Sequence, residues 1–170
     1  MLNSSHFIHI QTYQSPVGEM VLGSYDNKLC LANWADKKKS DSTNNRLKKS
    51  LNTVFVEEPS EIIYETIKQL DEYFKGERQH FDIPLLMVGT AFQKSVWNEL
   101  LQIPFGKTAS YTEQAKQIGN EKAVRAVANA NAANAISILI PCHRIIGSDG
   151  KLTGYAGGLD VKKKLLALEK

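Results

Sequence analysis

A short apolar run that stops at a proline constrains this chain more than any other stretch. Ile138-Leu139-Ile140 precedes Pro141, and Cys142-His143-Arg144-Ile145-Ile146 follows. An apolar run of this length predicts a buried strand. Because proline cannot donate a ladder hydrogen bond, Pro141 is expected to mark the end of that strand. Cys142 would then lie at the lip of the sheet, held by packed neighbours and beside His143 as a candidate base.

The composition is that of a globular protein in a reducing compartment. The 170 residues are 42% hydrophobic and 23% charged, and no apolar run reaches the roughly 18 residues that would predict a membrane span. Residues 1–6 lack the features of a secretory signal, so a cytoplasmic location is expected. The two cysteines, Cys30 and Cys142, are far apart and suggest no disulfide framework. Cys30 is expected to be a small buried hydrophobe, and the scattered histidines predict no metal site.

Charge is distributed unevenly along the chain. Residues 1–90 carry 10 Lys+Arg and 12 Asp+Glu, whereas residues 91–170 carry 11 Lys+Arg and 6 Asp+Glu. The C-terminal part is therefore the half that could approach a polyanion such as nucleic acid. Ordinary surface charge is the alternative interpretation of the same excess.

The N-terminal segment predicts a small antiparallel sheet. Three stretches with extended patterning, 7–12, 19–24 and 28–34, are separated by turn signals. Those signals are Ser15-Pro16-Val17-Gly18 and Asp26-Asn27. Strands separated by such short turns pair as neighbours.

One amphipathic helix is expected to accompany this sheet. Apolar residues repeat at helical spacing from Ile63 to Phe74, within the expected helix Glu61–Phe74. Ser60 is its expected cap. The lysine-rich stretch 37–50 is instead expected to be a mobile connection or a poorly ordered helix with a solvated surface.

The C-terminal segment contains the pattern of a helix-turn-helix. Thr90 and Ser110 each begin a capping-box sequence. Gly119 then stops one helix, and Asn120 is expected to cap the next. Helix, tight glycine turn and helix in succession is the pattern of this motif. The expected helices are 90–102, 110–118 and 121–131.

The third of these helices is expected to have an apolar inner side and a small, basic outer side. At about 100° per residue, its outer side consists of Lys122, Arg125, Ala126 and Asn129. Such a face can lie close against a nucleic-acid backbone while one long side chain projects. A solvent-facing helix with an incidental arginine is the alternative.

A Cys–His–carboxylate relay is the chemistry that the remaining motifs suggest. A cysteine is only a few per cent thiolate at pH 7, so His143 could act as its base and Glu169 could orient that histidine. Glu169 lies near the end of the last expected helix, 161–169 capped by Asp160, where a carboxylate suits the helix dipole poorly. Because neighbours on an extended backbone point to opposite faces, a water is expected between Cys142 and His143. A Cys-His dipeptide without a catalytic role is the alternative.

Several motifs resemble those of the O6-alkylguanine-DNA alkyltransferases, also called methylated-DNA–protein-cysteine methyltransferases. Pro141-Cys142-His143-Arg144-Ile145 is similar to the Pro-Cys-His-Arg-Val signature of that family. Further blocks occur in the family's order and cover essentially the whole chain. They are Ser15-Pro16-x-Gly18, Gly89-Thr90-x-Phe92-Gln93-x-x-Val96-Trp97, Ile103-Pro104-x-Gly106-x-x-x-Ser110-Tyr111, Ala123-Val124-Arg125-Ala126-Val127 and Tyr155-x-Gly157-Gly158-Leu159.

The resemblance implies an α/β (α+β) chain with two domains. A small N-terminal antiparallel sheet with a helix, ribonuclease H-like by resemblance, would form a support domain over residues 1–84. A mainly helical domain over residues 85–170 would contain the helix-turn-helix and the active-site cysteine.

The resemblance also implies catalytic roles. Cys142 would accept the alkyl group after losing its proton through a water to His143, which Glu169 would hold. Tyr111 would donate a proton or hydrogen bond to the guanine. Asn134 would hold the bend between the recognition helix and the active-site strand.

Other positions would contact DNA or the flipped base. Arg125 would enter the duplex as a finger from a recognition helix in the minor groove, and a glycine-rich loop around Tyr155 would cover the pocket. Ala156 stands where family members often carry a serine, and Ser137 stands where mammalian forms carry a proline. These two differences are expected to affect the range of alkyl groups accepted and the rate of transfer. The expected DNA contacts are Lys122, Arg125, Ala126 and Asn129, and the expected pocket residues are Ser137, Tyr155, Ala156 and Gly157.

The implied function is single-turnover DNA repair. The alkyl group of O6-alkylguanine, and of O4-methylthymine, in double-stranded DNA would move irreversibly to Cys142 of a monomer. No cofactor is expected, and the zinc ligands of some family members are not matched. A non-enzymatic lesion sensor of the alkyltransferase-like class is one alternative, although such proteins replace the cysteine. A thiol hydrolase unrelated to DNA is the other, and it would need a substrate cleft instead of an arginine-bearing helix.

Overall fold

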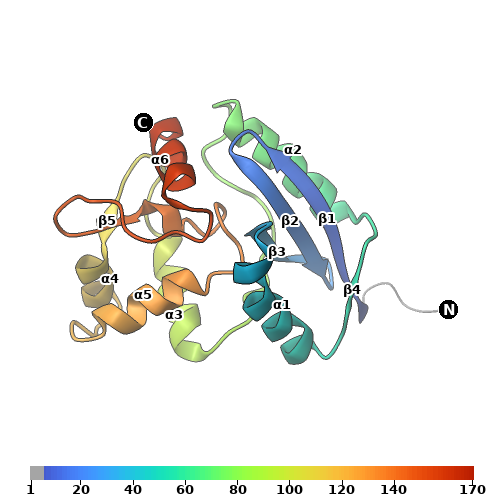
Figure 1. Ribbon diagram of the computed structural model, residues 1–170, viewed down its shortest axis with the longest axis horizontal. Coiled ribbons are helices and arrows are strands. Elements are labelled where there is room, and N and C mark those ends of the chain that lie inside the picture. The colour runs from blue at the N-terminus through green and yellow to red at the C-terminus, as the bar shows by residue number, and fades with distance from the viewer. Residues whose placement is uncertain (1–5) are drawn as a thin grey trace. The chain divides into compact units, whose positions relative to one another are not determined.

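The computed structural model describes residues 6–170, which form two compact units that divide between Val88 and Gly89 (Figure 1). The predicted fold class, a small N-terminal sheet with helices and a mainly helical C-terminal part, is confirmed. The division falls after the expected boundary at residue 84, because Leu86 donates a backbone hydrogen bond to Leu29 of the N-terminal sheet. Within residues 6–170, no helix combines the length and apolar character needed to cross a membrane.

The N-terminal unit is built on a four-stranded sheet in the order β3-β2-β1-β4. The three predicted strands pair as antiparallel neighbours. Asp26 and Asn27 have φ of 51° and 60°, the left-handed conformation that a two-residue hairpin turn requires. The fourth strand was not expected, and it pairs parallel to β1, so the sheet is mixed. The strands are β1 Ile8–Ser15, β2 Gly18–Tyr25, β3 Lys28–Trp34 and β4 Phe55–Val56.

The helix α2, Glu61–Phe74, has the bounds that the sequence predicts and packs on β1, β2 and β3 (Figure 1). The Ser60 hydroxyl accepts a hydrogen bond from the Ile63 amide, which caps the helix as expected. Cys30 is buried, as predicted. The core of this unit consists of apolar side chains from the sheet and its helices, among them Ile8, Met20, Leu22, Leu31, Leu47, Ile63 and Leu70.

The lysine-rich stretch after β3 is a regular helix, α1, Lys37–Leu51, and the expectation of a mobile connection was wrong. The Asp36 carboxylate caps its first turn by accepting from the Lys38 amide. Leu47 is completely buried on the inner side, and Lys48 lies 5.4 Å from the centre of the Phe55 ring. A few inward side chains therefore fix a helix whose remaining surface is polar, because tertiary packing and not propensity supplies most helix stability.

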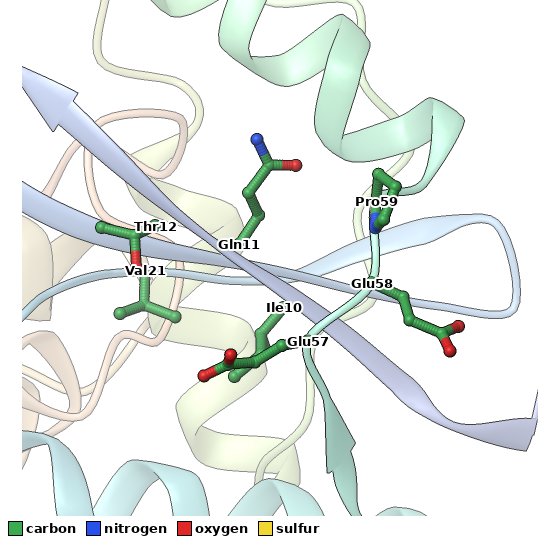
Figure 2. A pocket seen from close by; sticks show the side chains of 7 residues that line it. All are labelled: Ile10, Gln11, Thr12, Val21, Glu57, Glu58 and Pro59. Atoms are coloured by element: carbon green, nitrogen blue, oxygen red, sulfur yellow. The ribbon is translucent and has the colours of Figure 1, made fainter.

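One hollow of about 480 Å³ lies on the N-terminal unit beside β1 and β2 (Figure 2). Its rim carries two carboxylates, those of Glu57 and Glu58, next to Pro59. Neither a cysteine nor a histidine lines it. This hollow therefore lacks a nucleophile or a base of the kind that the sequence motifs predict.

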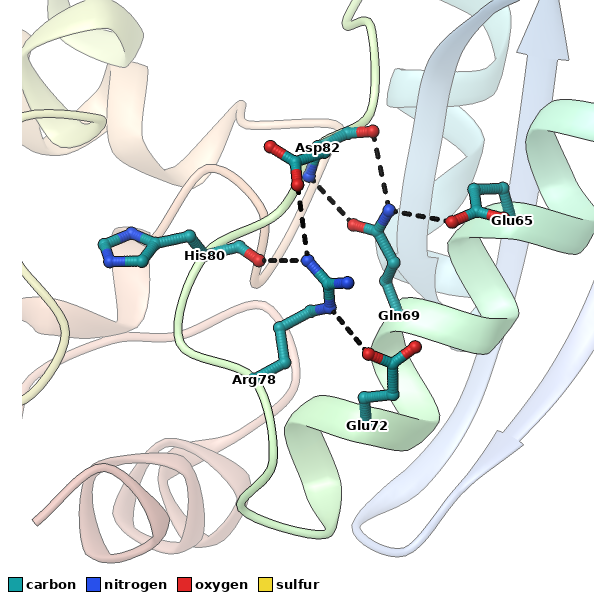
Figure 3. Close-up of polar contacts among 6 residues, drawn as sticks. All are labelled: Glu65, Gln69, Glu72, Arg78, His80 and Asp82. Atoms are coloured by element: carbon teal, nitrogen blue, oxygen red, sulfur yellow. Dashed lines mark hydrogen bonds and ion pairs between the residues drawn. The ribbon is translucent and has the colours of Figure 1, made fainter.

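The segment that follows α2 is held by side-chain bonds (Figure 3). Arg78 donates to Glu72 of α2 at 3.1 Å and to the His80 carbonyl at 2.7 Å. Gln69 accepts from the Asp82 amide at 2.9 Å and donates to Glu65 at 3.0 Å. These contacts tie the chain to α2 before it reaches the second unit.

The C-terminal unit is mainly helical, and its short parallel pair β5–β6 is the only sheet among its residues, all of which the structure describes. The tight segment η2 carries the cysteine of the signature motif. The elements are α3 Ala91–Leu100, β5 Ala109–Ser110, α4 Tyr111–Gln117, α5 Val124–Ala132, η2 Cys142–Arg144, β6 Ile145–Ile146 and α6 Leu159–Leu168.

Helix α3 packs against α5 through its buried residues. The predicted capping box at Thr90 is present, with reciprocal bonds to Gln93. Trp97 is buried and donates its indole N–H to the Ala130 carbonyl of α5 at 2.8 Å. The helix ends at Leu100, and Leu101, its C-terminal cap, is 40% exposed.

The helix-turn-helix consists of α4, a turn at Gly119 with φ of 78°, and α5. Gln114 of α4 and Asn131 of α5 exchange two buried hydrogen bonds of 2.9 and 2.8 Å, which hold the two helices together. Asn120 is not the cap that was expected. Its backbone carbonyl accepts from the Ala123 amide, so a turn intervenes and α5 begins later, at Val124.

The last helix, α6, begins two residues earlier than predicted, at Leu159 instead of 161. Gly158, with φ of 92°, precedes α6, and Asp160 lies inside its first turn instead of capping it. The buried face of the helix and its C-terminal cap consists of Lys162, Leu165 and Glu169. Two charged side chains therefore point inward from this helix, and they lie at the candidate site.

Candidate active site

The apolar run before the cysteine is a buried turn and not the predicted strand. Ile138 has φ of 72°, and the Ile140 amide donates back to the Ile136 carbonyl at 3.0 Å. The Cys142 amide then donates to Ile140, and η2 begins. Three apolar residues predict burial but do not distinguish a strand from a buried turn. The actual strand, β6, follows the cysteine.

The Asn134 side chain satisfies the backbone groups that a neighbouring strand would otherwise satisfy. Its carbonyl oxygen accepts from the Ile136 amide at 3.0 Å, and its amide donates to the Ile140 carbonyl at 2.9 Å. The same amide lies 3.3 Å from Sγ of Cys142 and donates to it. Buried polar backbone must find such partners, so Asn134 fixes both the turn and the thiol.

Cys142 is buried, and its surroundings act on its charge in opposite directions. Burial raises the pKa of the Cys142 thiol, while the Asn134 hydrogen bond and the Lys162 charge lower the same pKa. Desolvation is the largest of these effects. The resting group is therefore a thiol, and a base must take its proton before it can act as a nucleophile.

His143 is buried as a neutral imidazole. Burial lowers its pKa, although the Glu169 hydrogen bond and charge raise it in part. Its Nε2 lies 2.7 Å from Oε2 of Glu169. Because a carboxylate only accepts hydrogen bonds, Nε2 carries the proton and Nδ1 keeps its lone pair.

The Nδ1 atom of His143 is buried and has no hydrogen-bond partner among residues 6–170. A buried lone pair without a donor is the arrangement that a proton acceptor needs. Successive side chains of a 3₁₀ segment diverge by about 120°, and within the described part of the chain no hydrogen bond joins Cys142 to His143 directly. Because Cys142 and His143 lie on a 3₁₀ segment and not on a strand, it is this 120° divergence that separates their side chains and leaves a water to connect them.

Arg144 holds the far side of Glu169, and the sequence interpretation missed it. Its Nε donates to Oε1 of Glu169 at 2.7 Å, and Nη2 donates to Oε2 at 3.1 Å. Nη1 donates to the Ile103 carbonyl at 2.7 Å, and the guanidinium lies 5.8 Å from the centre of the Phe105 ring. This two-pronged pairing places a planar fork against a carboxylate, a geometry that only arginine provides.

Lys162 is the second residue that sequence reasoning missed. Its side chain is completely buried, and Nζ donates to the Thr153 carbonyl at 2.8 Å and towards the Gly154 carbonyl at 3.5 Å. In the sequence it begins the run Lys162-Lys163-Lys164, which looks like a solvated helix face. Leu165 and Leu166, three and four residues later, were the available signal, because at about 100° per residue they lie on either side of position 162.

The remaining predicted residues lie on the segments around this centre. Tyr111 is the first residue of α4, and its oxygen accepts a hydrogen bond from the Thr153 hydroxyl at 3.0 Å. The loop residues Tyr155, Ala156 and Gly157 are half-buried. Ser137 is completely buried, and its hydroxyl has no hydrogen-bond partner among residues 6–170.

The exposed face of α5 matches the face expected from the sequence. Val127 and Ala130 are buried. The four positions predicted to contact DNA are exposed, and they are Lys122, Arg125, Ala126 and Asn129. Residues 6–170 contain no cluster of three or more His, Cys, Asp or Glu side chains that could hold a metal ion.

The fold and the site define a two-unit protein whose helix-turn-helix unit carries a buried Cys–His–Glu cluster. The chain belongs to the 6-O-methylguanine DNA methyltransferase family, as its motifs predict. Residues 91–170 match the family's DNA binding domain, and residues 8–87 match its ribonuclease-like domain.

Several relatives match over nearly the full length of the chain. The methylated-DNA–protein-cysteine methyltransferase of Methanosarcina acetivorans is 47% identical over 92% of this chain and 95% of its own. That of Mycobacterium leprae is 42% identical over 96% of this chain and 93% of its own. The crystal structure of Mycobacterium tuberculosis OGT in complex with DNA aligns with a TM-score of 0.82 and 40% identity, over 95% of this chain and 92% of that one.

Replacing Arg144 by methionine should lower the free energy of unfolding by about 3–5 kcal/mol, because the buried Glu169 carboxylate would lose its counter-ion. Urea denaturation followed by circular dichroism measures this loss. The double variant Arg144→Met/Glu169→Gln should recover part of it, since no unpaired charge remains. A loss of less than about 1 kcal/mol, which is typical of an exposed ion pair, would contradict the buried pairing.

Proposed function

We propose that this chain repairs alkylated DNA by moving the alkyl group of O6-alkylguanine irreversibly to Cys142. The observation that carries this proposal is the buried thiol at 3.3 Å from Asn134, next to a histidine that Glu169 holds at 2.7 Å. The same compact unit presents the basic, small-residue face of α5. Family membership and the DNA-bound relative from M. tuberculosis support the same assignment.

Helix α5 is the DNA-contacting element in this proposal. Its exposed alanine and asparagine side chains allow a close approach to the minor groove, and Arg125 projects from them to occupy the space of the flipped nucleotide. Lys122, exposed in the turn just before α5, neutralises a phosphate. Flipping a nucleotide out of the duplex costs a few kcal/mol, and the cost is lowest for a damaged, poorly paired base. The lesion itself therefore favours entry into the site.

The transfer begins with the Cys142 proton, which passes through a water to Nδ1 of His143. Glu169, paired with Arg144, stabilises the imidazolium that forms. The thiolate gives an electron pair to the alkyl carbon, so a C–S bond forms while the C–O6 bond breaks and its electrons move onto the guanine. Tyr111 donates a hydrogen bond or a proton to the leaving base. The proton that left Cys142 and is held by His143 ends on the guanine product, either directly or by replacing the proton that Tyr111 has given up.

One contact supports this role for Tyr111. Its oxygen accepts from Thr153, so its own phenolic proton stays available for a second partner. The product at Cys142 is a thioether, which thiol exchange does not reverse, and the chain carries no second cysteine nearby in sequence. Each molecule therefore acts once.

The flipped base occupies a pocket formed by Ser137 and the loop of Tyr155, Ala156 and Gly157 in this proposal. Because residue 156 is an alanine, the loop backbone N–H groups bind O6 without help from a side-chain hydroxyl. O4-methylthymine presents a similar alkylated oxygen and is the second substrate. The chain acts as a cytoplasmic monomer without a cofactor.

The direct test is mass spectrometry after incubation with duplex DNA that contains O6-methylguanine. One methyl group should appear per protein, on the peptide that contains Cys142, with no turnover beyond one equivalent. Cys30→Ser should behave like the wild type, and Cys142→Ser should gain no methyl group. Binding of the lesion without a mass change would identify a lesion sensor instead, and no interaction with the lesion would reject both functions.

The role of Arg125 has its own test. Arg125→Ala should slow repair of duplex DNA at least about tenfold, which corresponds to roughly 1.4 kcal/mol of barrier, because flipping loses its support. Transfer from free O6-benzylguanine, which needs no flipping, should change less than about twofold. Arg125→Lys keeps the charge, and its rate of duplex repair should lie between that of the wild type and that of Arg125→Ala. Equal losses of rate with duplex DNA and with free O6-benzylguanine would contradict the role of Arg125 as the residue that enters the duplex.

A further inference from the structure

The buried face of α6 brings two opposite charges to the region of Cys142. Lys162 and Glu169 lie two turns apart on the same side of this helix. Lys162 is 0% exposed and Glu169 is 3% exposed. Lysine is almost never fully buried unless it is paired, and the partners of Lys162 found so far are two neutral carbonyls.

The buried charges around the thiol do not balance while the thiol is protonated. Arg144 and Lys162 are cations, Glu169 is an anion, and His143 is neutral. Both oxygens of Glu169 are engaged by Arg144 and His143. One buried positive charge is therefore left without an anion, and it is the charge on Lys162.

The other elements packed around η2 offer no competing counter-ion. Helix α3 packs on η2, and its buried side chains are Val96, Trp97 and Leu100, none of which carries a charge. The phenol of Tyr111, on α4, contacts the loop through Thr153. Helix α6, which carries Lys162 on its buried face, itself packs on η2, and η2 begins at Cys142, the group of this segment that becomes an anion during the proposed reaction.

We propose that Lys162 is the positioning counter-ion of the Cys142 thiolate, a role that rests on the function proposed above. The carbonyls of Thr153 and Gly154 fix the ammonium, and the thiolate becomes its anionic partner once His143 has taken the proton. The net charge of the buried cluster stays the same, because the proton remains on His143, but the thiolate gives the Lys162 ammonium an anionic partner while Glu169 faces the imidazolium. The electrostatic influence is mutual, because the Cys142 charge raises the pKa of Lys162, which burial lowers.

The same two carbonyl bonds anchor the loop that leads to Tyr155. Lys162 thus has a structural contribution as well, and the experiment must separate it from the charge. Lys162→Gln retains N–H donors for the loop but removes the charge. Lys162→Met removes both, and Lys162→Arg retains the charge. Lys163→Met is the matched control, since Lys163 is exposed on the same helix.

The measurement is the pH dependence of the rate at which Cys142 accepts the benzyl group from free O6-benzylguanine, followed by intact mass. Lys162→Met and Lys162→Gln should both shift the midpoint of the profile upward by about one unit, because an opposite charge nearby favours the ionised thiol. Their rates should be about tenfold lower near neutral pH and should approach the wild-type rate at high pH. Lys162→Arg and Lys163→Met should keep a midpoint near that of the wild type.

Three outcomes would overturn the proposal. An unchanged midpoint in Lys162→Met would show that the charge does not act on the thiol. An equal loss at every pH, or rescue of the profile by the uncharged Lys162→Gln, would leave Lys162 as a loop anchor only. Urea denaturation of each variant confirms that it is folded. If the wild type transferred no benzyl group at any pH, the proposed function itself would fail, which is a distinguishable result.

Discussion

The buried carboxylate of Glu169 is the interaction on which the active unit depends. It receives hydrogen bonds from Arg144 at 2.7 and 3.1 Å and from His143 at 2.7 Å. A buried carboxylate is costly unless hydrogen-bond donors engage its oxygens, and these three donors engage both of them. The contact joins the end of α6 to η2, and Arg144 extends it to Ile103. One residue near the end of the chain thereby sets the orientation of the residue beside the nucleophile.

This arrangement defines the protonation states of the site before any substrate arrives. Glu169 places the proton of His143 on Nε2, which leaves Nδ1 as the base. Asn134 reaches from the end of the helix-turn-helix to the sulfur of Cys142 at 3.3 Å. The element proposed to contact DNA and the element that holds the thiol are thus joined by a single side chain. The Asn134 side chain that bonds to the sulfur also holds the turn that follows α5.

Local signals allowed much of the fold to be predicted. The bounds of α2 and the start of α3 followed from Ser60 and Thr90, because a helix cap depends on neighbouring residues only. Two errors arose where tertiary contacts override local patterns. The run at Ile138 was taken for a strand because the bonds of Asn134 to its backbone are not visible in the sequence. Helix α1 was expected only as a poorly ordered alternative to a mobile connection, because a single buried leucine among many lysines gives a weak periodic signal.

The site was predicted less completely than the fold. The sequence predicted that Cys142, His143 and Glu169 form one relay. The roles of Arg144 and Lys162 were missed, because a buried charged residue and an exposed one look alike in a sequence. The central claim is that Glu169 holds a neutral His143 with a free Nδ1. Nitrogen-15 NMR of the four histidines, with His143 assigned by its loss in His143→Gln, tests this claim directly. At pH 7 the spectrum should show a protonated Nε2 and an unprotonated Nδ1, and a protonated Nδ1 would contradict the account.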